Sequence, residues 1–574
     1  MEINHYEFEY GEYGETKDVQ INLRGFDILR YNNISKGTAF TTDERRKLKL
    51  DGYLPPRVKS LDEQVKSSLR ILSEKENDIE KFIYLRSLYD RNVVLAHAVI
   101  ASDVTSFLPI IYTPTVGLAC QQYSNMFRRA NGIHFYPGNI DQAEHILHHY
   151  TDQDIRVAVV TDNQGILGIG DQGAGGIPIC LGKLMLYTQG AGIAPWHCLP
   201  ISLDVGTDND DLLNDPNYLG WRERRLTGDA YYEFIEKFVT AFKKVFPKAL
   251  CQWEDFSKQT AFTVRDKYLK EVVSFNDDIQ GTGSITLAGI IAAMKVTKES
   301  MTDQVYLVHG AGAGGVGIAE QIQTELEEQG MSAEDAIARI FTLDSRGVVT
   351  SDRDLEPYKI KYAKDPASLT WLKSPEDNTL LNVVKNEKVT VLIGTSGQPG
   401  CFTREVVDAV AEHTDRPVIL PLSNPTSKTE ALPVDVFEWT DGKALVATGS
   451  PFADVEHNGK AYRIGQMNNA FVFPGVGLGV VASGATEVLP VFFSAAAHAV
   501  AEFISEEDIK DGILCPPLHQ LREVSIAVAK RVGAEAIKAG VTQDDCPFSR
   551  FKHENNEARL NALIDNMCWN PVYF

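Results

Sequence analysis

The sequence predicts an α/β protein with a doubly wound, mostly parallel sheet, a helical N-terminal domain and a second α/β domain. Two observations predict this fold class. Short β-branched segments alternate with helical segments over residues 280–467, as happens when crossover helices join parallel strands. Residues 1–130 instead carry apolar residues at helical spacing, such as Leu85, Leu88 and Tyr89. The expected domains are a helical one over 1–130, an α/β one over 131–279 with 468–540, the parallel sheet over 280–467, and an extension over 541–574.

The composition restricts the classes of function. The chain has 574 residues, enough for about three domains of ~100–200 residues each. It carries 56 basic and 78 acidic residues, and this net charge of −22 disfavours a nucleic-acid partner. The N-terminal residues do not form a signal-peptide pattern, and no apolar segment reaches the ~20 residues of a membrane span. The eight cysteines show neither metal-binding nor disulfide-framework spacing, so we expect a cytoplasmic protein without a membrane partner.

Local signals predict the elements of the first half of the chain. Thr41, followed by Thr42-Asp43-Glu44, is typical of a helix start, because a hydroxyl side chain can cap free N–H groups. Pro109–Gly117 is an apolar run that predicts a strand broken at Tyr112. Ile155–Thr161 is rich in β-branched residues and predicts another strand. The segment 166–173 is too rich in glycine for a helix and predicts backbone that closely approaches a ligand or a strand.

The second half predicts the parallel sheet itself. Helices are expected between its strands, for example at Gly317–Glu328 and Arg404–Glu412. The expected strands are Gln304–Val308, Arg339–Leu343, Val389–Ile393, Pro417–Leu422 and Ala444–Thr448. Ligands of such sheets bind outside the carboxyl ends of the strands.

A glycine-rich turn follows the first of these strands. Gly310, Gly312 and Gly315 form a G-x-G-x-x-G motif between a strand and a helix, where backbone N–H groups can approach a pyrophosphate. Asp344 ends the next strand and is placed to accept hydrogen bonds from ribose hydroxyls. The motif therefore predicts a Rossmann-type dinucleotide site. Asp344 favours NAD, because a carboxylate repels a 2′-phosphate, while Arg346 and Lys359 nearby leave NADP open.

Two pairs of acids lie among aromatic and apolar residues. Glu254 and Asp255 stand between Trp253 and Phe256, and Asp277-Asp278 follow Phe275-Asn276. Carboxylates in such surroundings are costly unless they are paired or bind a metal. A set of carboxylate oxygens without a Cys or His cluster suits Mg²⁺ or Mn²⁺. Helix caps and surface ion pairs are the alternative interpretation.

Four further polar residues have two interpretations each. Tyr112 could fill a core or take part in chemistry. Lys183, in an apolar run, could extend its ammonium group to solvent or act as a desolvated general base. Asn424, which follows an expected strand, and Asn469 could bind a carboxylate or hydroxyl, or could form a cap or turn.

Taken together, these motifs resemble the malic enzyme family in order and spacing. The segments that carry the resemblance are 111–117, 253–256, 275–282, 423–426, 448–452 and Asn468-Asn469, and the resemblance covers nearly the whole chain. It implies oxidative decarboxylation of L-malate to pyruvate and CO₂, with a nicotinamide cofactor and a divalent metal ion. It also implies a homodimer or homotetramer.

The resemblance further implies roles for single residues. Glu254, Asp255 and Asp278 match the metal ligands of the family. Lys183 matches the general base that takes the proton of the malate hydroxyl, with Asp277 close to it.

The remaining matches concern the product and the substrate. Tyr112 matches the general acid that protonates the enolpyruvate carbon. Asn424 and Asn469 match substrate contacts, and Asn424 is also placed near the cofactor.

One segment departs from the family pattern. Malic enzymes usually read Thr-Asp-Gly-Glu-Arg where this chain has Thr161-Asp162-Asn163-Gln164-Gly165, so the arginine that holds a malate carboxylate is replaced by Gly165. Malolactic enzymes, a close branch, are similar in having glycine there. Loss of a bidentate arginine contact weakens malate binding unless another cation, such as Arg128 or Arg129, compensates.

Three hypotheses follow from these comparisons. The first is an NAD-preferring malic enzyme. The second is a malolactic enzyme that retains NAD and releases L-lactate and CO₂. The third, from another class, is a catalytically silent regulatory protein that binds NAD or a metabolite, against which the presence of Lys183, Tyr112 and the three acids argues.

Overall fold

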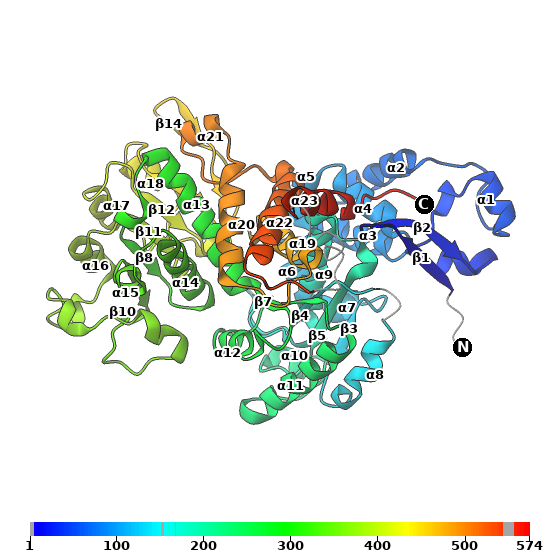
Figure 1. The fold of residues 1–574 in the computed structure, drawn as a ribbon, viewed down its shortest axis with the longest axis horizontal. Coiled ribbons are helices and arrows are strands. Elements are labelled where there is room, and N and C mark those ends of the chain that lie inside the picture. The colour runs from blue at the N-terminus through cyan, green and yellow to red at the C-terminus, as the bar shows by residue number, and fades with distance from the viewer. Residues whose placement is uncertain (1–4, 151–153, 167, 544–555) are drawn as a thin grey trace. The chain divides into compact units, whose positions relative to one another are not determined.

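The computed structural model describes residues 5–150, 154–166, 168–543 and 556–574. The chain divides into two compact units, and both are discontinuous. The first unit comprises residues 1–252, 480–486 and 542–574, and the second comprises 253–479 and 487–541. Figure 1 labels many of the elements and colours the chain from blue at the N-terminus to red at the C-terminus.

The first unit begins with a hairpin that the sequence analysis does not predict. Strands β1 (Tyr6–Tyr10) and β2 (Thr16–Ile21) pair antiparallel. The helices α1 (Thr42–Lys47), α2 (Leu61–Ser73), α3 (Asp78–Tyr89) and α4 (Val93–Ala101) follow. The predicted start of α1 is confirmed, because the Thr41 side chain accepts from the Glu44 backbone N–H and the Glu44 carboxylate accepts from the Thr41 N–H.

The strand predicted at Pro109–Gly117 is wrong. Helix α5 (Val104–Ile111) ends immediately before Tyr112, and α6 (Thr115–Gln121) and α7 (Tyr123–Met126) follow it. The Asp103 side chain caps α5 by accepting from the Ser106 N–H. A short apolar run has the same pattern in a buried strand and in a buried helix, so the N-cap residue Asp103, six residues before Pro109, was the better signal.

A parallel arrangement organises the rest of the first unit. Strands β3 (Ile133–Phe135) and β4 (Val157–Thr161) both pair in parallel with β5 (Cys198–Leu203), which confirms the strand predicted at Ile155–Thr161. Within the first unit the strand order is β3-β5-β4. Strand β6 (Leu250–Glu254) lies where the first unit ends in the sequence, and β7 (Ser274–Asn276) belongs to the second unit. Helix α9 (Ile177–Ala191) packs on β4 and β5 and is buried along almost its whole length.

A seven-stranded sheet forms the centre of the second unit and confirms the predicted fold class. Its strand order is β10-β9-β8-β11-β12-β13-β16, and every neighbouring pair is parallel except β10 with β9. The strands are β8 (Tyr306–His309), β9 (Ile340–Asp344), β10 (Gly347–Val348), β11 (Val391–Gly394), β12 (Val418–Pro421), β13 (Leu445–Thr448) and β16 (Gly465–Gln466). Each of the five predicted strands is present.

Helices accompany this sheet as predicted. Helix α14 (Ala313–Glu328) follows β8, and α17 (Arg404–Ala411) follows β11. Helices α13 (Thr282–Thr297), α20 (Pro490–Glu502) and α22 (Leu521–Lys538) pack together, drawn green to orange in Figure 1. By length and composition, the helical stretch Asp277–Thr297 could cross a membrane, but most of it is buried inside the protein, as in a core helix.

The C-terminal residues return to the first unit. Helix α23 (Asn556–Met567) precedes Trp569, which packs in one apolar cluster with Val94, Ala194 and Trp196. The Trp569 N–H donates to the Gly192 carbonyl at 2.7 Å, and the Tyr573 hydroxyl donates to Gln64 at 2.6 Å. The first unit is thus completed by residues at the two ends of the chain.

Candidate active site

The glycine-rich turn lies between β8 and α14, as the motif predicts. Gly310 has φ +122°, which L side chains rarely adopt. A Cβ on Gly315 would lie 1.8 Å from the Gly310 carbonyl oxygen, so the turn itself requires glycine at both positions. A Cβ on Gly312 would meet only the flexible Lys258 side chain, at 3.4 Å. Packing within the protein therefore does not explain why position 312 is glycine.

The turn lies at the point where the strand order reverses. From β8 the chain continues outward to β9 on one side and later to β11 on the other. The Thr395 hydroxyl, just after β11, donates to the Gly310 carbonyl at 2.9 Å, and the Thr395 N–H donates to His309 at 2.8 Å. Dinucleotides bind in doubly wound sheets at this reversal, outside the carboxyl ends of the strands.

Asp344 ends β9, as predicted. Its negative charge is neutralised by more cationic side chains than the sequence indicates. Arg353 donates to its Oδ2 at 2.5 Å and Lys359 at 3.3 Å, and the Arg346 backbone N–H donates to Oδ1. Burial acts to raise the pKa of Asp344, and these hydrogen bonds outweigh it, so the pKa is lowered. Sequence reasoning identified Lys359 and missed Arg353, whose position relative to Asp344 depends on the fold of the intervening loop.

Asn424 follows β12 at the same edge of the sheet. Its Oδ1 accepts from the Ser450 hydroxyl at 2.5 Å, and Ser450 follows β13. Asn424 is therefore held by a neighbouring strand end of the second unit.

Three of the four predicted acids come together in the second unit. Ligand oxygens of Glu254, Asp255 and Asp278 all lie within 4.8 Å of one another. Glu254 ends β6, Asp255 follows it, and Asp278 belongs to a single π-helical turn, Asp277–Gly281, before α13. Glu254 and Asp255 are buried, so their interpretation as surface ion pairs is excluded.

The backbone around these acids fixes their direction. Asp255 has φ +56°, a left-handed conformation that non-glycine residues rarely adopt outside special sites. Its N–H donates to Asp278 Oδ2 at 2.8 Å, which ties the two segments together. Oxygen ligands gathered at this spacing fit a hard divalent cation such as Mg²⁺ or Mn²⁺.

Asp277 lies beside the acid cluster in sequence but has a different partner. It is fully buried, and the Asn469 amide donates to its Oδ2 at 3.1 Å and to its carbonyl at 3.2 Å. Asn469 Nδ2 also lies 3.2 Å from the Thr282 hydroxyl oxygen. Asn469 therefore orients Asp277, a contact between residues 192 positions apart that sequence reasoning did not predict.

In the first unit the structure brings Lys183 and Tyr112 together. Lys183 lies on α9 with a side chain only 1% exposed, so the interpretation in which its ammonium group reaches solvent is excluded. Its Nζ lies 5.2 Å from the centroid of the Tyr112 ring. The glycine at position 182 allows this approach, because a Cβ there would lie 2.7 Å from the Ile111 carbonyl oxygen at the end of α5.

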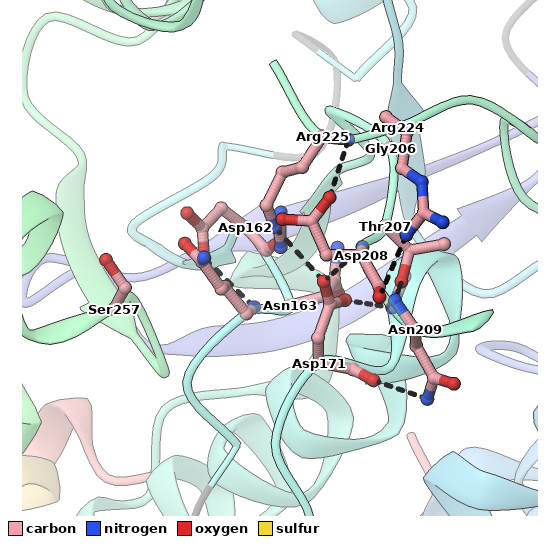
Figure 2. A network of polar contacts seen from close by, with 12 residues as sticks. Asp162, Asn163, Asp171, Gly206, Thr207, Asp208, Asn209, Arg224, Arg225 and Ser257 are labelled. Carbon is pink, nitrogen blue, oxygen red and sulfur yellow. Dashed lines mark hydrogen bonds and ion pairs between the residues drawn. The ribbon is translucent and has the colours of Figure 1, made fainter. Parts of the chain in front are cut away.

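A buried ionic network holds the loop in which glycine replaces the family arginine. Figure 2 shows Arg225 between Asp162, at the start of this loop, and Asp171, near its end. The Arg225 Nη atoms donate to the Asp162 carbonyl at 2.5 and 2.9 Å, and its Nε lies 3.3 Å from Asp171 Oδ2. The Tyr231 hydroxyl donates to the Asp162 carboxylate at 2.7 Å.

The charges of this network shift one another's pKa values. Burial raises the pKa of Asp162, and Arg225 and Tyr231 offset part of that effect. Burial also opposes the charge of Arg225, but Asp162 and Asp171 outweigh it and raise the pKa of Arg225. Sequence reasoning missed Arg225, because 63 residues separate it from Asp162.

The two arginines suggested as substitutes for the missing family arginine have other contacts. Arg128 Nη1 donates to the carbonyls of Asn125 and Phe127. Arg129 Nη1 donates to the Asp90 carbonyl at 2.5 Å. Arg128 therefore holds backbone at the end of α7, and Arg129 holds backbone at the end of α3.

Comparison with family models decides the assignment. Residues 89–269 match the malic enzyme N-terminal domain, and residues 279–537 match the malic enzyme NAD-binding domain. The chain belongs to the malic enzyme family.

Relatives and solved structures agree with this assignment. The chain is 42% identical over 564 residues to an NAD-dependent malic enzyme of Proteus mirabilis, with 98% of each chain covered, and equally identical to one of Photorhabdus laumondii. Its fold is similar to malic enzymes of Pyrococcus horikoshii (TM-score 0.52, 23% identity, covering 81% of this chain and 89% of that one) and Entamoeba histolytica (TM-score 0.53, 18% identity, covering 91% and 98%). The predicted resemblance and fold class are confirmed.

Proposed function

We propose that this malic enzyme family member oxidatively decarboxylates L-malate to pyruvate and CO₂ while reducing NAD, with the help of a divalent metal ion. The observation that carries the proposal is the gathering of Glu254, Asp255 and Asp278 within 4.8 Å, in a chain that matches NAD-dependent malic enzymes over 98% of its length. Carboxylate oxygens at that spacing fit Mg²⁺ or Mn²⁺.

The second unit would hold the metal ion and the cofactor. Glu254, Asp255 and Asp278 would hold the ion, which when bound polarises the substrate oxygen as a Lewis acid. The turn with Gly310, Gly312 and Gly315 would hold the pyrophosphate of NAD through backbone N–H groups, and Asp344 would accept from the ribose hydroxyls. Because Arg353 and Lys359 already balance the charge of Asp344, the repulsion of a 2′-phosphate is reduced, and use of NADP stays a measurable alternative.

Lys183 and Tyr112 would move the protons. Lys183, 1% exposed, would take the proton of the malate hydroxyl at its Nζ while C2 loses a hydride, and Asp277, held by Asn469, would assist it. Tyr112 would then donate the proton that converts enolpyruvate to pyruvate. Asn424 and Asn469 would contact the substrate, and Asn424 would also lie near the cofactor. These roles rest on the family resemblance and on the burial and contacts of each residue.

The same resemblance supports two properties of the whole protein. We propose a cytoplasmic homo-oligomer, a dimer or tetramer, that binds neither nucleic acid nor membrane. The net charge of −22 supports the absence of a nucleic-acid partner. Analytical ultracentrifugation of the full chain distinguishes the two assemblies from a monomer.

One experiment tests the proposed reaction. Purified protein is mixed with L-malate, Mn²⁺ and NAD, the absorbance at 340 nm is followed, and pyruvate and L-lactate are both assayed. We expect NADH and pyruvate to appear in equal amounts. Lactate without net NADH would instead identify a malolactic enzyme, the reaction that Gly165 leaves as the alternative. Tight NAD binding without turnover of malate or any other 2-hydroxy acid would identify a regulatory protein.

A further inference from the structure

Glu430 is a fully buried acid near the carboxyl ends of β11 and β12, and the proposed reaction assigns no role to it. Its side chain fills the space over Gly394, the last residue of β11, where a Cβ would lie 2.5 Å from Glu430 Cδ. Burying a carboxylate is costly unless it is hydrogen-bonded. The hydrogen-bond partners of Glu430 therefore indicate what this position contributes.

The partners of the Glu430 carboxylate are two serines from different loops. Its Oε1 accepts from the Ser396 N–H at 2.8 Å and from the Ser396 hydroxyl at 2.9 Å. The same oxygen accepts from the Ser423 hydroxyl at 2.5 Å, and Oε2 accepts from the Ser423 N–H at 3.3 Å. Each serine thus gives its backbone and its side-chain donor to one carboxylate, which offers about four acceptor positions.

Further hydrogen bonds join the same two loops. The Gly397 N–H donates to the Ser423 hydroxyl oxygen at 2.9 Å, so this hydroxyl links the loop 395–402 to Glu430. The Phe402 N–H, at the other end of that loop, donates to the Glu430 carbonyl at 3.0 Å. Both ends of the loop that follows β11 are therefore held at Glu430.

Both loops lie at the predicted cofactor edge of the sheet. The Thr395 hydroxyl, one residue before Ser396, donates to the Gly310 carbonyl at 2.9 Å. A Cβ on Gly310 would lie 2.7 Å from the Ser396 nitrogen, so this loop lies directly against the glycine-rich turn. Ser423 immediately precedes Asn424. One buried carboxylate thus ties together the segments next to the turn and next to the asparagine.

We propose that Glu430 is a positioning residue of the cofactor site. Through Ser396 it holds the loop after β11 against the Gly310 turn, and through Ser423 it fixes the backbone that carries Asn424. It acts through these two serines and not by contact with NAD or malate. The inference rests on the proposed function for its kinetic test, whereas its NAD-binding test requires no turnover.

Glu430→Gln tests the proposal with little change of shape. The amide replaces one acceptor with a donor, so the Ser423 N–H would face another N–H group. The dissociation constant of NAD, measured by fluorescence titration of the full chain, should rise at least fivefold. With L-malate and Mn²⁺, the KM for NAD should rise by a similar factor while kcat stays within threefold, because Lys183 and Tyr112 are unchanged.

Glu325→Gln is the matched control. Glu325 is another buried carboxylate of the second unit, 2% exposed, which contacts His498 at 3.0 Å and accepts from Gln329 at 2.9 Å. It lies near the C-terminal end of α14, about 18 Å along the helix from the glycine-rich turn. A loss of stability lowers the melting temperature of either variant, but only Glu430→Gln should weaken NAD binding.

Ser423→Ala tests the same contact from its other side and needs no change at Glu430, so it remains informative if Glu430→Gln fails to fold. Loss of the bridging hydroxyl should raise the dissociation constant of NAD at least threefold. In the double variant, the second substitution should add less than twofold, because residues that act through one contact have non-additive effects.

Three results would overturn the proposal. The first is an unchanged NAD affinity in Glu430→Gln or in Ser423→Ala. The second is equal weakening of NAD binding in Glu430→Gln and Glu325→Gln, which would reflect a general loss of stability. The third is full additivity of the two effects in the double variant. A protein that binds NAD but does not oxidise malate would contradict the proposed function alone, and the NAD titrations would still decide the role of Glu430.

Discussion

The buried position of Lys183 bears directly on its proposed role as the general base. The side chain of Lys183 is 1% exposed, and its Nζ lies 5.2 Å from the centroid of the Tyr112 ring. This burial supports the proposed role of Lys183 as the general base. The structure thus excludes the interpretation in which the ammonium group of Lys183 reaches solvent, and its role as general base stays a prediction.

Replacement of Lys183 tests this role. Lys183→Ala should lower kcat for malate oxidation by ~10²–10⁴, the usual contribution of a general base. NAD binding, measured by fluorescence titration, should remain, since the cofactor turn belongs to the second unit. Lys183→Arg should be similarly slow, because it keeps the positive charge but not a proton acceptor. Turnover close to normal in Lys183→Ala would remove the assignment.

The proposed metal ligands allow a similarly specific test. Asp255→Ala should abolish stimulation of malate oxidation by Mn²⁺, because one of the three proposed oxygen ligands is lost. Asp352→Ala, at an exposed aspartate of the same unit, is the control and should retain stimulation. A Mn²⁺-activated Asp255→Ala enzyme would contradict the ligand role.

Several contacts of single residues could not be predicted from the sequence. The burial of Glu254 and Asp255 could be predicted, because their aromatic neighbours indicated buried acids. The contact of Arg225 with Asp162 could not be predicted, since nothing in the sequence near position 225 indicates it. Arg353 was missed for the same physical reason, as its contact with Asp344 depends on how the chain turns between them.

Among the elements, strands with strong local signals were predicted well. β8, β9 and β11 are short β-branched runs with glycine or acidic residues at their ends, so their pattern has few alternatives. Helix α5 was mistaken for a strand because its eight residues are too few to show helical periodicity. The hairpin of β1 and β2 was missed although Tyr6, Phe8 and Tyr10 alternate with glutamates, which is itself a strand pattern.

The turn between β8 and α14 distinguishes glycines needed for folding from glycines needed for binding. Gly315→Ala should lower the free energy of unfolding, because its Cβ would lie 1.8 Å from a backbone oxygen. Gly312→Ala should leave that free energy nearly unchanged but weaken NAD binding at least tenfold, since only a flexible lysine side chain is near its Cβ. Urea unfolding and NAD titration of both variants measure the two effects. Unimpaired NAD binding in Gly312→Ala would place the pyrophosphate elsewhere.

The loop from Asp162 to Asp171 offers a test of its buried arginine. Arg225→Gln should lower the free energy of unfolding of the first unit by ~3–5 kcal/mol, the cost of leaving a buried carboxylate without its cation. The adjacent Arg224→Gln is the matched control. Arg224 forms an exposed ion pair with Asp210, which contributes only ~0–1 kcal/mol. Similar urea midpoints for the two variants would contradict the structural role of Arg225.

At the scale of the whole molecule, metal binding should be visible without any catalysis. An ion that binds only the folded protein stabilises it by about 2.7 kcal/mol at 100 times its dissociation constant. Mn²⁺ should therefore raise the melting temperature, and an excess of chelator should reverse the rise. The Asp255→Ala variant should show no such shift in differential scanning calorimetry. An equal shift in that variant would indicate that Mn²⁺ stabilises the protein from another site.

The discontinuous first unit has a consequence for biosynthesis. Trp196 gains its partner Trp569 only after the ribosome has translated the entire second unit. Domains usually fold as units during translation, and N-terminal domains usually fold first. The first unit, however, includes residues 542–574, which are translated last. A nascent polypeptide arrested near position 252 would carry an uncovered tryptophan patch, the kind of surface to which holding chaperones attach.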